Sequence, residues 1–97
     1  MSKISVTREL QAKGGRYVAT VEGFPGEAEL IFSRADPSIV VANHTGTPVA
    51  MRDQGVAAVL VKRLVADARA EGFRIVPLCP FVEAQFKRHP EWSDLRA

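Results

Sequence analysis

Cysteine is nearly absent from this 97-residue chain, and long apolar runs are missing altogether. The single cysteine, Cys79, has no partner for an intramolecular disulfide, which excludes a small secreted domain held together by disulfide bonds. No apolar stretch approaches the roughly 18 residues that a membrane-spanning helix requires. The first residues alternate in polarity and do not form the apolar core of a signal peptide. The sequence therefore predicts a cytoplasmic protein with no membrane partner.

An excess of charge of one sign is also missing. Thirteen Lys and Arg residues stand against eleven Asp and Glu residues, which leaves a formal net charge of +2 at pH 7. Nucleic-acid-binding domains usually carry a stronger basic bias, with the basic residues clustered on one face. We therefore expect no nucleic-acid partner, and a small basic RNA-associated domain is a weaker alternative.

The residues that are present have the composition of a globular protein. Hydrophobic residues make up 46% of the chain and charged residues 25%, close to the average for folded domains. Disorder along the whole chain is therefore excluded. The length fits a single domain over residues 1–97 with one modest core.

The first half of the chain alternates apolar and polar residues in short segments. This period of two is typical of half-buried strands. Turn-forming residues at 13–15, 23–26 and 36–37 separate the segments. The pattern predicts an antiparallel meander of four strands over residues 4–7, 16–21, 27–32 and 38–44.

In the second half the apolar spacing changes to that of a helix. Val56, Leu60 and Leu64 fall on one helical face, and Gly72 follows where a helix commonly ends. A strand that follows a helix is expected to run parallel to its neighbour. The pattern predicts a helix over 54–70, a strand over 74–78 and a shorter helix over 81–88. The element order is thus β-β-β-β-α-β-α, a mixed α/β or α+β fold, with Trp92 and Leu95 of the tail packed on the core.

A short motif lies where the fourth strand leads into the first helix. Arg52 is followed by Gly55 and Ala57 in the pattern Arg-x-x-Gly-x-Ala. A glycine at a helix start lets backbone N–H groups approach an anion, and the helix N-terminus carries about half a unit of positive charge. The motif favours a pyrophosphate site. The alternative is structural, with Gly55 as a helix-start glycine and Asp53 as the helix N-cap.

The stretch from His44 to Trp92 resembles the GNAT superfamily of N-acetyltransferases. In that superfamily the pattern Q/R-x-x-G-x-G/A cradles the pyrophosphate of acetyl-coenzyme A (acetyl-CoA). The resemblance is closer to a group of small single-domain GNAT-like proteins. It rests on His44-Thr45, Pro48, the Arg52 motif, the segment Val-Pro-Leu-Cys-Pro-Phe at 76–81 and the segment Arg-His-Pro-Glu-Trp at 88–92.

The resemblance implies a minimal GNAT-like domain and a position for the cofactor. Its sheet would be mostly antiparallel, with the fourth and fifth strands parallel and splayed apart. The pantetheine arm of coenzyme A would lie between those two strands. The resemblance implies a cofactor site formed by Thr45, Thr47 and Val49 along the pantetheine arm and by Arg52, Gln54, Gly55, Val56 and Ala57 at the pyrophosphate.

Two residues are candidate catalysts under this resemblance. Cys79 follows the fifth strand, near the expected thioester, where it could act as a base, a proton relay or a transient acyl carrier. Its alternative is a buried small apolar residue. His44 ends the fourth strand and could take a proton from the acceptor amine; its alternative is a structural histidine. Phe86 stands where related enzymes often have a tyrosine that protonates the leaving thiolate, and a phenylalanine has no proton to donate.

These features predict an acetyl-CoA-dependent N-acetyltransferase. The acceptor would be an amine on a protein or another bulky substrate, because few residues remain to build a lid over a small one. The chain would act as a monomer or a homodimer. No metal is expected, since Cys79 and the two histidines lack the spacing of zinc ligands. The alternative function is a coenzyme A-binding module without efficient catalysis, such as a sensor or partner-binding domain.

Overall fold

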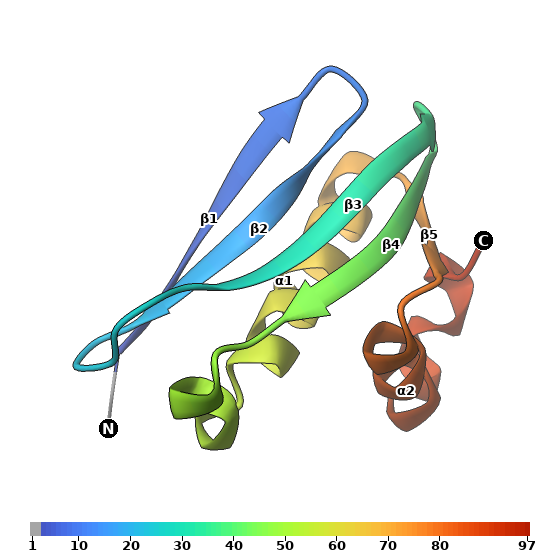
Figure 1. The fold of residues 1–97 in the computed structure, drawn as a ribbon. Helices are drawn as coiled ribbons and strands as arrows, with labels where there is room; N and C mark the ends of the chain where they lie inside the picture. Colours follow the sequence, from blue (N-terminus) through green and yellow to red (C-terminus); the bar gives the residue numbers. More distant parts are fainter. Residues whose placement is uncertain (1–2) are drawn as a thin grey trace.

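A five-stranded sheet with α1 lying across one face forms the body of the computed structural model, which describes residues 3–97 (Figure 1). The strands lie in the order β1-β2-β3-β4-β5; the first four are antiparallel, and β5 runs parallel to β4. This confirms the predicted mixed fold and its parallel pair. The elements are β1 (Ile4–Gln11), β2 (Gly14–Val21), β3 (Ala28–Asp36), β4 (Ile39–Gly46), the 3-10 helix η1 (Val49–Gln54), α1 (Val56–Glu71), β5 (Arg74–Pro77), α2 (Pro80–Arg88) and the 3-10 helix η2 (Pro90–Leu95).

The strands of the first hairpin are longer than predicted. β1 continues to Gln11, and the two glycines expected in the turn belong to β2. A Cβ atom at Gly14 would collide with the carbonyl oxygen of Phe32, and one at Gly15 with that of Glu9. These glycines therefore allow neighbouring strands to approach closely, a use of glycine that sequence alone does not separate from a turn.

The apolar stripe of α1 forms the core with the sheet. Leu60, Val61 and Leu64 are fully buried against the face of the sheet that carries Ala19 and Leu30. Burial of this stripe stabilises the helix, because an isolated helix of this length is only marginally stable in water. The helix begins two residues later than predicted, since residues 49–54 form η1, which the apolar spacing did not indicate.

The C-terminal segment packs on the core beside β5. Trp92 and Leu95 are buried, as predicted. The ring of His89 stacks on Trp92 with 3.9 Å between centroids, which ties the end of α2 to η2. The backbone N–H of Ala97 donates to the carbonyl oxygen of Ile75 at 2.8 Å. The tail therefore covers the outer edge of β5. Within residues 3–97 no helix has the length and apolar character needed to cross a membrane.

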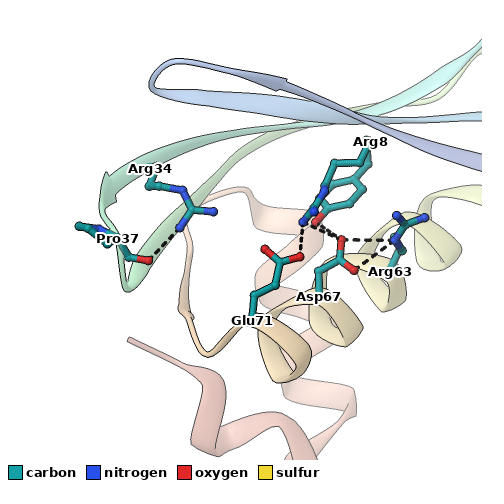
Figure 2. Close-up of polar contacts among 7 residues, drawn as sticks. Arg8, Arg34, Pro37, Arg63, Asp67 and Glu71 are labelled. Atoms are coloured by element: carbon teal, nitrogen blue, oxygen red, sulfur yellow. Dashed lines mark hydrogen bonds and ion pairs between the residues drawn. The ribbon is translucent and has the colours of Figure 1, made fainter.

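A buried tyrosine and a cluster of charges fasten the first hairpin to α1 (Figure 2). The Tyr17 hydroxyl donates to Asp67 Oδ2 at 2.7 Å. Arg8 Nη1 lies 3.2 Å from the same carboxylate oxygen and 2.6 Å from Glu71 Oε2, and Arg63 Nε lies 3.3 Å from Asp67. Burial and the hydrogen bond to Asp67 raise the pKa of Tyr17 far above its ordinary value, so the hydroxyl remains a neutral donor.

Replacing Tyr17 with phenylalanine should lower the free energy of unfolding by about 1 kcal/mol, the usual net contribution of one hydrogen bond. The aromatic ring and its packing on Phe32 are retained, so only the hydroxyl is lost. Urea denaturation followed by circular dichroism measures the change. In an Asp67→Ala background the acceptor is gone, and Tyr17→Phe should be less destabilising. An equal loss in both backgrounds would contradict this account of the hydrogen bond.

Candidate functional site

The parallel strands β4 and β5 separate at one end of the sheet. Their pairing runs from Ile39–Arg74 to Ala42–Pro77. Beyond that pair β4 continues to Gly46, while the chain after β5 turns away into α2 (Figure 1). The strands are therefore splayed, as the resemblance implied, and the last residues of β4 border the resulting gap.

A pocket of about 390 Å³ lies where the end of β4, the start of α1 and α2 meet. Thr45 and Thr47 line it from β4 and the following loop, and Arg52 lines it from η1. The first turn of α1, residues 55–58, forms a second wall, and Phe81 and Gln85 of α2 form a third. The site thus combines hydroxyl groups, a cation and a helix N-terminus in one concave space.

A somewhat larger hollow of about 450 Å³ lies at the β1–β2 hairpin. It is lined by residues 11–16 together with Ile31 and Phe32. Neither a helix N-terminus nor Cys79 borders it. The pocket beside α1 is therefore the better candidate site, although it is the smaller of the two.

The N-terminus of α1 is open toward the pocket. Gly55 occupies the N-cap position with a φ of +69°, which favours glycine, and a Cβ atom there would meet nothing within 4 Å. Over residues 3–97 no side chain caps this helix, and its first turn has no acidic residue. The structural alternative is right about Gly55, which is a helix-start glycine, and wrong about Asp53, which is exposed and is not the N-cap. The uncapped N–H groups and the helix dipole favour an anion.

The other predicted cofactor residues surround this helix start in different ways. Arg52 is exposed, and its Nε donates to the carbonyl oxygen of Thr47 at 3.5 Å, which places the guanidinium at the pocket. Val49 lies in η1 and is 77% exposed, and Gln54 ends η1; neither belongs to the lining. Val56 and Ala57 are part of it. The binding roles of all these residues stay predictions.

Cys79 connects the end of β5 to α2 and is only 5% exposed. Its backbone N–H donates to the carbonyl oxygen of Ala42 at 2.9 Å, and its Sγ lies 3.6 Å from Thr45 Oγ1. Burial opposes ionisation of the thiol, but backbone N–H groups of Val82 and Phe81 and the Thr45 hydroxyl outweigh it, so the pKa of Cys79 is lowered. Thr45 therefore contacts the Cys79 thiol and also lines the pocket.

His44 is not brought together with Cys79. It lies opposite Ile31 in the sheet, whereas Thr45 lies opposite Leu30, which is fully buried on the α1 side. His44 is exposed on the other face. The reason is a β-bulge at residue 43, where the register with β3 shifts by one residue. Simple alternation from Ala42 would turn His44 toward α1, and the bulge reverses this. Its catalytic role stays a prediction.

A comparison with protein families identifies the family of this chain. The family model described as GCN5-related N-acetyl-transferase matches residues 16–95. The chain belongs to the GCN5-related N-acetyltransferase family. None of the curated proteins compared with the chain matches it. Family membership confirms the resemblance and supports an acetyltransferase activity in general; members of the family typically use acetyl-CoA.

In this member of the N-acetyltransferase family the third wall of the pocket was missed by sequence analysis. Gln85 is buried on α2 with 7% of its surface exposed, and Phe81 lies one helical turn before it. A signal was available, because Gln85 is three residues after Val82 and next to Phe86, on the face that packs inward. Within residues 3–97 no group of three His, Cys, Asp or Glu side chains is placed to hold a metal ion.

Proposed function

We propose that the chain is an acetyl-CoA-dependent N-acetyltransferase whose cofactor binds in the pocket between β4, α1 and α2. One observation carries the proposal: the uncapped N-terminus of α1 and the Thr45 hydroxyl, which contacts Cys79, border the same pocket. The pocket therefore offers an anion site at one wall and a thiol of lowered pKa behind another. The anion site suits the pyrophosphate of acetyl-CoA, and the thiol could accept a proton during transfer of the acetyl group.

The residues present fit coenzyme A. Gly55, Val56 and Ala57 would hold the pyrophosphate through backbone N–H groups, with Arg52 adding a permanent positive charge. The backbone of Thr45 and Thr47 borders the gap left by the separation of β4 and β5, where an extended arm can add to the strand edge. Val49 and Gln54, outside the lining, would contribute from η1.

The chemistry assigned to Cys79 is proton transfer. Acetyl-CoA supplies the acetyl group as a thioester, so transfer forms a C–N bond to a neutral amine, breaks the C–S bond and releases coenzyme A. The amine must lose a proton, and the lowered pKa of Cys79 suits its thiolate to accept one. Thr45 orients the sulfur through its hydroxyl. His44, exposed beside the bulge, is the second candidate base for an amine that approaches from the other face.

A protein amine or another bulky acceptor should be turned over faster than a free small amine. The connections between strands are short, and in the described part of the chain the face of the sheet opposite α1 carries no helix that could cover a small substrate (Figure 1). Release of coenzyme A, followed with a thiol reagent, measures the rates for peptides and for small amines.

The solution mass serves as the control for this comparison, because a homodimer could supply the missing wall from the second chain. Efficient turnover of a free small amine by a strict monomer would contradict the prediction.

One observation favours the second candidate function, a coenzyme A-binding module without efficient catalysis. Phe86, at the position where an acidic tyrosine is common, is buried and packs against Trp92 with 5.6 Å between ring centroids. It has no proton for the leaving thiolate. Saturable binding of acetyl-CoA, with no release of coenzyme A when any amine is added, would favour this candidate over the enzyme.

A further inference from the structure

Gln85 is an unusual residue in the core of this protein. Among residues 3–97 it is the only buried residue whose side chain is charged or carries an amide. Its buried neighbours on α2, Val82 and Phe86, are apolar. An amide is costly to remove from water unless it forms hydrogen bonds, so an aliphatic side chain would suit simple packing better. The Gln85 carboxamide therefore requires a hydrogen-bond partner.

The partner is not found within the described chain. The Gln85 carboxamide makes no hydrogen bond to any of residues 3–97. Yet no fully enclosed side-chain nitrogen or oxygen in that part of the chain lacks a partner. The carboxamide must therefore reach a surface, and the surface that Gln85 borders is the pocket beside α1. It is available there to a bound molecule.

The chemistry of the carboxamide selects the kind of group it binds. It offers one C=O acceptor and an NH₂ donor and carries no charge. Arg52 and the N-terminus of α1 supply the positive side of the pocket, so the anionic part of a ligand belongs there. A trans secondary amide presents its N–H on one side and its C=O on the other, and the Gln85 carboxamide can accept from the N–H or donate to the C=O.

We infer that Gln85 is a specificity residue that hydrogen-bonds an amide of the arm linking the thioester to the pyrophosphate. The inference rests on the proposed function and extends it to α2, the third wall of the pocket. It assigns to Gln85 the recognition of the arm, while the first turn of α1 recognises the phosphates.

Replacing Gln85 with methionine tests this inference. Methionine keeps the length and flexibility of the side chain and suits a buried position, but it forms no amide hydrogen bond. Calorimetry should show about tenfold weaker binding of acetyl-CoA, as expected for the loss of hydrogen bonds to a neutral group. Binding of adenosine 3′-phosphate 5′-diphosphate, which has the phosphates but no arm, should be unchanged. Gln11→Met, at an exposed glutamine of β1, is the matched control and should alter neither affinity.

The two ligands separate the possible results. Equal weakening for both would overturn the inference, because it would show a general change of the pocket. Unchanged binding of acetyl-CoA by Gln85→Met would overturn it as well, with the proposed function intact. If the unmodified protein binds neither ligand, the proposed function fails and the inference fails with it. Thermal unfolding of Gln85→Met confirms that the variant compared is folded.

Discussion

Glutamate in place of Gly55 should reduce the affinity for acetyl-CoA more than a hundredfold. The uncapped first turn of α1 borders the pocket at this residue, and over residues 3–97 no acidic side chain competes for its N–H groups. A carboxylate at the N-cap would occupy the anion site and repel the pyrophosphate at close range. Isothermal titration calorimetry of the purified variant measures the loss.

Gly55→Gln is the matched control for this change. Both side chains have the same size, and both meet the same backbone strain at a φ of +69°, while a Cβ atom at this position has open space around it. The strain should lower stability in both variants by about 1–2 kcal/mol. Only the charge differs, so glutamine should retain most of the affinity. Equal affinities for the two variants would show that no anion binds at this helix start.

Replacing Cys79 with serine should lower the rate of acetyl transfer at saturating acetyl-CoA about a hundredfold, the lower end of what a general base contributes. Serine fits the same space and can still contact Thr45, but its hydroxyl does not ionise at neutral pH. Affinity for acetyl-CoA should change little, because Cys79 is not part of the pocket lining. Coenzyme A release under single-turnover conditions measures the rate.

The pH dependence of the rate identifies the sulfur as the base. Because only the thiolate accepts a proton, the rate should rise with pH through a pKa below that of an ordinary thiol. Thr45→Val removes one of the hydrogen bonds that lower this pKa, so the rise should move to higher pH. If Cys79→Ser melts at a lower temperature but keeps its rate, Cys79 is a buried structural residue. Acetyl-Cys79 trapped before the acceptor is added would indicate an acyl carrier instead of a base.

The sequence contained enough information for the architecture. The alternation in the first half and the apolar stripe of α1 mark the side chains that are buried in the fold. The spacing of apolar residues along the sequence therefore predicts the strands and the helix. The uncapped helix start was not predicted, since the helix was expected from residue 54 with Asp53 as a possible N-cap, whereas α1 begins at Val56 with Gly55 as its N-cap. The 3-10 helix η1 was not predictable, because its six residues are too few to show a periodicity.

The faces of β4 show why the site was harder to predict. Residue 43 is an extra residue against β3, and this bulge turns Thr45 toward Cys79 and His44 away from it. A bulge depends on the neighbouring strand, so the sequence of β4 alone does not reveal it. Gln85 was overlooked for a different reason: its spacing from Val82 and Phe86 indicated the inward face of α2, but a polar residue on a short helix is ordinarily exposed.

The most direct test of the account is a titration of the isotope-labelled protein with acetyl-CoA, followed by backbone amide resonances. The account predicts saturable shifts at residues 55–58, at Thr45 and Thr47, and at Phe81 and Gln85, the three walls of one pocket. The resonances of residues 11–16, at the hairpin hollow, should stay in place. Shifts confined to the hairpin, or no saturable shift at any residue, would contradict the claim that this pocket binds acetyl-CoA.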